Sequence, residues 1–227
     1  MKKTLYFLLS LALCLTLSPV FNNFNTVVSA QENNVFIENI NDEITPEQEM
    51  VEMGNELDMD VYAFQTTKEI PSVQTYSLTG NDYKRYEMTT DYYFVDRDAT
   101  NGYMYKQDST AIVGAAAHIN ISVAYDYYIQ NHSEYTKFVS TSGSVTNFNS
   151  GFSFVRAEVN YGSSGPQYPG QAIYTVSYSP SWYYSGPSNW GYNILGSGGT
   201  FIGSNATVYI TRDGSTTYSG YLNVTVS

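Results

Sequence analysis

Cysteine is almost absent from this chain of 227 residues, because it occurs only once, at Cys14. That residue lies inside an apolar run from Leu5 to Leu17, which two lysines precede and the small residues Val28-Ser29-Ala30 follow. This layout is typical of a cleaved secretory signal peptide, so we expect residues 1–30 to be removed. The mature chain then has no cysteine, which excludes disulfide bonds, thiolate catalysis and cysteine metal ligands.

Basic residues are also scarce, with ten lysines and arginines against 21 acids and a net charge of −11. A chain without basic clusters is not expected to bind nucleic acid or to be captured electrostatically by anionic membranes. The acids are unevenly spread, because residues 31–69 hold eleven acids and one base whereas residues 70–227 hold ten acids and seven bases. Tyrosine shows the opposite pattern, since 21 of 23 follow Ile70. We therefore expect an acidic leader at 31–69, either a pro-segment or a spacer, before a single domain at 70–227.

Motifs for common enzyme chemistry are missing as well. The sequence contains no H-E-x-x-H and no G-x-S-x-G, and its two histidines, His118 and His132, have no zinc-type spacing. We accordingly expect no cofactor and no enzymatic activity. Carboxylates near expected strands, Asp126, Glu134 and Glu158, are the residues that a glycosidase-like reaction would have to use.

One short helix is expected in the leader. Thr45-Pro46-Glu47-Gln48 combines a capping residue, a proline at the first helical position and a glutamine placed to close a capping box. Met50, Met53 and Leu57 follow at helical spacing. Two interpretations are open: the helix docks on the domain that follows, or it belongs to a flexible acidic spacer.

The rest of the chain is expected to be all-β. In the segment Ala115–Gln130 apolar residues alternate with polar residues, which indicates a strand with one face in a core. Further alternating segments recur with turn residues between them, including a turn at Gln130–Ser133 and a change of phase near Phe154 that indicates a bulge. This pattern favours an antiparallel β-sandwich, with a closed β-barrel as the alternative.

A weak calcium candidate lies in the expected hairpin after residue 95. Asp96, Asp98 and Asn101 could supply oxygen ligands, but the spacing fails the EF-hand pattern. A turn that uses Asp and Asn for backbone hydrogen bonds explains the same residues, so no metal is expected.

The strongest positive signal is an aromatic segment that contains both tryptophans. Exposed aromatic rings can stack against the C–H faces of sugars, and neighbouring amides can bind sugar hydroxyls. The same rings could instead fold inward as a lid on the core. The candidate ligand-binding residues are Trp182, Tyr183, Tyr184, Asn189, Trp190, Tyr192 and Asn193.

These observations together predict a secreted, extracellular, non-enzymatic binding or interaction module. Its composition is typical of an exported protein of a Gram-positive-type bacterium, and its expected partner is a cell-wall or host glycan or an extracellular protein. A membrane-active, β-pore-forming toxin-like protein is the first alternative, because amphipathic hairpins rich in Ser, Thr and Tyr suit that class. A small extracellular hydrolase is the third interpretation.

Overall fold

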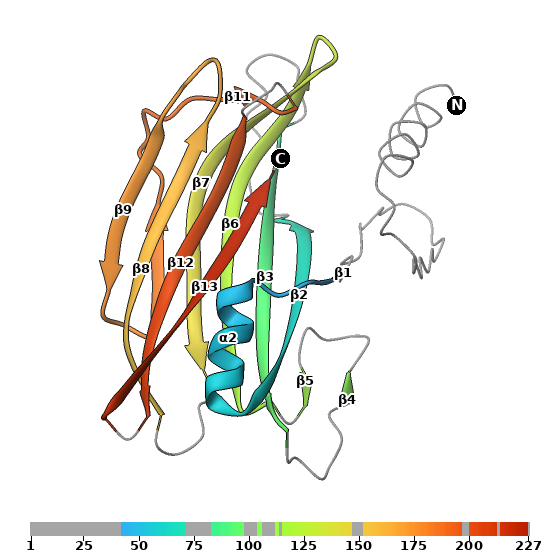
Figure 1. Ribbon diagram of the computed structural model, residues 1–227. Helices are drawn as coiled ribbons and strands as arrows, with labels where there is room; N and C mark the ends of the chain where they lie inside the picture. Colours follow the sequence, from blue (N-terminus) through green and yellow to red (C-terminus); the bar gives the residue numbers. More distant parts are fainter. Residues whose placement is uncertain are drawn as a thin grey trace. The chain divides into compact units, whose positions relative to one another are not determined.

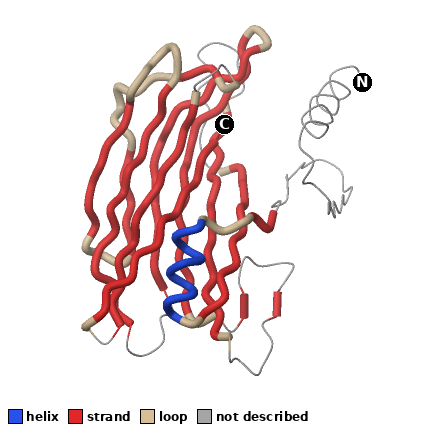
Figure 2. Tube along the Cα trace, in the orientation of Figure 1, coloured by secondary structure: helices blue, strands red, loops and turns tan. Residues whose placement is uncertain are grey.

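Antiparallel strands and one short helix make up the described part of the chain (Figure 2). The computed structural model describes residues 42–70, 83–97, 104–105, 112–113, 115–146, 152–196, 200–212 and 214–226. These residues belong to one compact unit that begins at Ile37. The expected signal peptide lies outside the described residues.

The larger sheet has seven strands in the order β1-β2-β3-β6-β7-β10, with β11 also paired to β7. Every pair in it is antiparallel. Its strands are β1 (Asp42–Ile44), β2 (Met59–Glu69), β3 (Lys84–Asp96), β6 (Ala117–Gln130), β7 (Ser133–Thr146), β10 (Ser181–Ser185) and β11 (Asn193–Ile194).

The smaller sheet has four strands in the order β13-β12-β8-β9, also antiparallel. Its strands are β8 (Phe152–Ser164), β9 (Gln171–Ser177), β12 (Phe201–Arg212) and β13 (Thr216–Val226), and β4 (Met104–Tyr105) pairs separately with β5 (Ile112–Val113). The larger and the smaller sheet pack face to face around a shared apolar core, and among the described residues neither of them closes on itself (Figure 1). The fold is therefore the predicted all-β sandwich.

Strand β6 shows how the sequence pattern produces this core. Its alternate residues Ile119, Ile121 and Val123 are fully buried between the sheets. The even-numbered residues of the strand, His118 among them, face the other side of the sheet, where Nε2 of His118 hydrogen-bonds Asp91 of β3 at 2.7 Å. The period-2 alternation of the sequence thus assigns the two faces of this strand correctly.

Two local predictions are also confirmed. Asn131 and His132 have φ values of 50° and 63°, which is the backbone of a tight two-residue hairpin turn between β6 and β7. The register between β12 and β8 shifts where Tyr209 faces Arg156 and Ile210 faces Phe154, which leaves one extra residue in β8.

Helix α2 (Gln48–Leu57) is part of the same core. Met50, Met53 and Leu57 are buried in the cluster that both sheets share, and the helix contacts β13 and β2 (Figure 1). The helix begins two residues later than the expected proline position, after Glu47, with no side-chain cap. Residues 42–69 thus contribute β1, α2 and β2 to the sandwich, and the change in charge near Ile70 is not an edge of the folded unit.

Candidate functional site

Both tryptophans of the predicted aromatic segment lie in the core. Trp182 is 6% exposed and Trp190 is 9% exposed. Trp190 packs against Phe138 and Tyr161 at ring distances of 5.5 and 6.3 Å. Of the two interpretations of this segment, the platform facing solvent is wrong for the two indoles, because they fill the apolar space between the sheets as an inward lid would.

The alternation of strand β10 explains this burial. Trp182 and Tyr184 point inward, and Tyr184 stacks on Tyr161 with the ring planes 3° apart. Tyr183 lies between them in sequence, faces outward and is 65% exposed. Only one of the three consecutive aromatic residues is thus available to a ligand.

The remaining predicted residues are also separated. Asn193 is fully buried and ties down a neighbouring loop, because its Oδ1 accepts the backbone N–H of Tyr168 at 3.0 Å. Tyr192 packs against Tyr128 on the outer side of the large sheet. Asn189 is exposed in a loop. The structure therefore does not gather the predicted set into one surface.

No metal centre is evident in the part of the chain that the structure describes. Asp96 is described and exposed, whereas Asp98 and Asn101 lie outside the described residues. Within the described residues, no group of three or more His, Cys, Asp or Glu side chains is placed to hold an ion. None of the described helices is long and apolar enough to span a bilayer.

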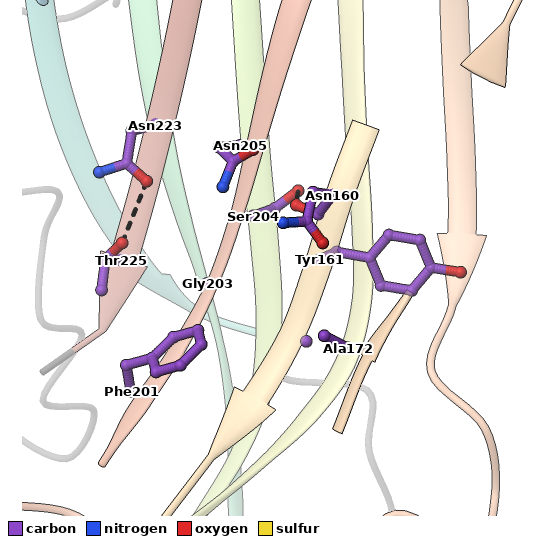
Figure 3. A pocket seen from close by; sticks show the side chains of 10 residues that line it. Asn160, Tyr161, Ala172, Phe201, Gly203, Ser204, Asn205, Asn223 and Thr225 are labelled. Carbon is purple, nitrogen blue, oxygen red and sulfur yellow. Dashed lines mark hydrogen bonds between the residues drawn. The ribbon is translucent and has the colours of Figure 1, made fainter. Parts of the chain in front are cut away.

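A different site is visible on the outer face of the small sheet (Figure 3). Asn160, Asn205 and Asn223 come from β8, β12 and β13, and the strand register places them in one row across the three strands. Figure 3 shows the three amides on the same side of the sheet, while Tyr161 points away from them. Asn160 is exposed, and the other two are half-buried.

The amides of this row have free hydrogen-bonding capacity. Asn223 accepts a hydrogen bond from the Thr225 hydroxyl at 3.1 Å through its Oδ1 (Figure 3). Within the described residues, no hydrogen bond engages the side chains of Asn160 or Asn205. Each amide offers both donors and an acceptor, so the row can bind neighbouring hydroxyl groups.

Beside the amide row the sheet surface is bare backbone. Gly162 and Gly203 are paired neighbours there, and Ala172 continues the row on β9. A Cβ at Gly203 would lie 2.9 Å from the carbonyl oxygen of Val224, so only glycine fits without a shift. These small residues form the floor of a hollow of about 60 Å³. That volume holds about two water molecules, so a larger ligand can lie across the hollow but cannot be enclosed in it.

The edge of the hollow is formed by Phe201, which is 43% exposed. An exposed ring next to polar amides is a surface that suits an amphipathic ligand. None of the residues that line the hollow is an acid, a lysine, an arginine or a histidine. The site can therefore hold neutral, hydroxyl-bearing molecules but offers neither a catalytic carboxylate nor a metal-binding set.

The sequence contained part of this site. The three asparagines occupy alternate positions beside the buried residues Val159, Ala206 and Leu222, so the period-2 pattern could have placed their side chains outward. What the pattern could not supply is the register that brings residues 160, 205 and 223 into one row.

Comparisons with known proteins return no match: no family model, no curated protein and no solved structure matches the chain.

Proposed function

We propose that this protein is a secreted, non-enzymatic β-sandwich module that binds a neutral glycan, of a cell wall or of a host, across the hollow of the small sheet. Secretion is supported by the signal-peptide layout of residues 1–30. The observation that carries the binding proposal is the row of Asn160, Asn205 and Asn223 beside the exposed ring of Phe201.

This arrangement suits a sugar for two reasons. Amide groups donate to and accept from sugar hydroxyls, and the free amides of Asn160 and Asn205 are on neighbouring strands. An aromatic ring can pack against the apolar C–H face of a pyranose, which is the role proposed for Phe201. The absence of charged residues from the lining favours a neutral sugar over an acidic one.

The shape of the site favours a chain over a single sugar. A hollow of about 60 Å³ can receive the edge of one ring only. The outward positions of β8 and β12 continue past the amide row, where Thr207 lies opposite Glu158 and Tyr209 opposite Arg156, so a polysaccharide can extend along the face beyond one sugar. We expect weak binding per sugar, because each neutral hydrogen bond adds about 0.5–1.5 kcal/mol.

The proposal is tested by affinity electrophoresis and titration calorimetry with a panel of neutral polysaccharides. In the double variant N160A/N205A, the loss of two hydrogen bonds should weaken binding about tenfold. F201A should weaken it as well, since the stacking surface is lost. The matched control is T217A, an exposed residue on the same strand as Asn223 and about 20 Å from it.

Three outcomes would count against this function. Absence of binding to any neutral polysaccharide, or equal binding by wild type and N160A/N205A, would refute the proposed site. Dye release from liposomes would favour the pore-forming alternative. Release of reducing sugar from a bound glycan would favour the hydrolase alternative. That reaction needs a catalytic carboxylic acid, and none lines the hollow.

A further inference from the structure

We propose a second ligand site on the outer face of the large sheet, formed around Lys137 and Tyr183, for the carboxylate of an acidic saccharide. It lies on the opposite sheet from the hollow and differs from it in charge. The proposal stands independently of neutral glycan binding, because it uses other residues and another chemistry.

The first observation is a row of charges across three strands. The register places Arg85 of β3, Asp126 of β6 and Lys137 of β7 next to one another on the outer face. Arg85 donates to both carboxylate oxygens of Asp126, at 2.7 and 3.0 Å. A bidentate pair of this kind neutralises the charge of the carboxylate and holds it toward Arg85. Lys137, on the other side of Asp126, has no carboxylate partner within the described residues.

Lys137 is exceptional among the lysine and arginine side chains that the structure describes. Glu134, three residues earlier on the same strand, lies on the opposite face of the sheet, where it helps to raise the pKa of Tyr127. The ammonium of Lys137 lies 5.8 Å from the ring of Tyr192 instead. The side chain of Arg212 lies outside the described part of the structure. Each of the other lysines and arginines with a described side chain contacts a carboxylate: Lys68 with Glu87, Lys84 with Glu69, Arg85 with Asp126, Arg97 with Asp58 and Asp60, and Arg156 with Glu158.

The unpaired ammonium of Lys137 can attract an anionic ligand. The chain carries a net charge of −11, and its other described cations are neutralised locally. A partly covered lysine that is left without a counterion offers one position where an anionic group gains a direct charge-assisted contact. The ring of Tyr192 beneath it helps to fix the ammonium in place.

The second observation is the exposed ring of Tyr183 on the same face. Its hydroxyl is held by hydrogen bonds with Ser140 and Ser185, which lower the pKa of Tyr183, as does the nearby charge of Arg85. The ring is therefore anchored at its polar end and presents its apolar face to solvent. Ser140 is three residues from Lys137 on β7, about 10 Å along the strand.

The ammonium of Lys137 and the ring of Tyr183 can contact two different parts of one acidic sugar. A uronic acid chain carries an apolar C–H face that can lie on Tyr183 and a carboxylate that can reach Lys137. The half-buried Ser142 lies opposite Tyr183 in the strand register, and its hydroxyl can bond a sugar hydroxyl. A neutral sugar would lack the contact with the ammonium, so the site should discriminate by charge.

The test compares acidic oligosaccharides from polygalacturonate, alginate and hyaluronate with methyl-esterified polygalacturonate, which keeps the shape but lacks the charge. K137Q should weaken binding of at least one acidic probe about tenfold, since hydrogen bonds to charged groups contribute about 1.5–3 kcal/mol. Binding of the methyl ester should not change. Y183A should weaken both probes, whereas Y183F should keep most of the affinity.

The control is K68A, which removes one positive charge from the same sheet at a lysine already paired with Glu87. Equal effects of K68A and K137Q would refute the proposal, because net charge alone would then explain binding. Absence of wild-type binding to all three acidic probes would also refute it. If N160A/N205A abolished acidic binding while K137Q did not, the acid would occupy the small-sheet hollow. Thermal unfolding of each variant verifies that the fold is retained.

Discussion

Replacing Gly220 with alanine should destabilise the sandwich through its contact with helix α2. Gly220 lies on the inner face of β13, where a Cβ would lie 3.1 and 3.2 Å from Cε and Sδ of Met53 and closer still to Sδ of Met50. Both methionines are buried, so their ends have little room to move. Overpacking of this kind destabilises by about 1–3 kcal/mol.

The same contact predicts how two substitutions combine. Met50→Ala alone should destabilise by about 2–5 kcal/mol, because it leaves a cavity in the core. In the double variant the methyl group of alanine at position 220 enters the space that Met50 leaves. The combined loss should therefore be smaller than the sum of the single losses, by about 1–2 kcal/mol.

Urea unfolding followed by tryptophan fluorescence measures these free energies, because Trp182 and Trp190 are both buried in the core. Val51→Ala is the matched control on the same helix, since Val51 is 38% exposed and should change stability by less than about 0.5 kcal/mol. Strict additivity of Gly220→Ala and Met50→Ala would refute the packing of α2 on β13. Wild-type stability of Met50→Ala would show that residues 42–69 are a spacer after all.

Further predictions concern pH and two other positions. Burial raises the pKa of Tyr125 to about 12, so the folded state holds this proton after the unfolded chain begins to lose it near pH 10. Urea titrations should show the free energy of unfolding falling as the pH rises above about 10. The proton of Tyr125 alone contributes about 2 kcal/mol of that loss by pH 12, so Tyr125→Phe should remove this share. Gly143→Ala places a methyl group against the Trp182 ring and should destabilise by about 2 kcal/mol or more in urea. Ultraviolet titration should lose its earliest phenolate signal in Tyr183→Phe, because the hydrogen bond with Ser140 lowers the pKa of Tyr183.

Local features of the fold were readable from the sequence because they depend on short-range geometry. The alternation in Ala115–Gln130, the turn at Asn131 and the bulge beside Phe154 each depend on neighbouring residues only. Strand order was not readable, because it depends on which distant strands pair. An example is β10, which pairs with β7 in the larger sheet, whereas its sequence neighbours β8 and β9 belong to the smaller sheet.

The leader shows why charge composition is a poor guide to domain edges. Glu49 and Glu52, two of the acids that the structure describes, are exposed, so their charge indicates a surface position and not a domain boundary. Its few apolar residues, among them Met53, Leu57 and Ala63, enter the core. The helical spacing of the methionines was the better signal, because it reports on burial.

The aromatic segment was predicted as one site from its composition, although the alternation of a strand already places its residues on two different faces. In Ser181–Ser185 the period of two puts Trp182 and Tyr184 on one face and Tyr183 on the other. Since Trp182 is the largest apolar side chain of this strand, its face is the one expected to be buried. Trp190 lies outside any strand, so its burial against Phe138 follows from the tertiary fold and could not be derived locally.

The burial of the tryptophans also determines which experiments can locate a binding site in this protein. Trp182 lies over Gly143 and Trp190 packs on Tyr161, so alanine at either position would leave a large cavity and weaken the fold by about 3–5 kcal/mol. A tryptophan variant that lost glycan binding would therefore report unfolding rather than a lost contact. Asn205 and Lys137 are at the surface of opposite sheets, where substitution changes a ligand contact and leaves the core intact. Selective effects of these two substitutions, one on neutral and one on acidic glycans, are therefore the direct evidence for two binding faces.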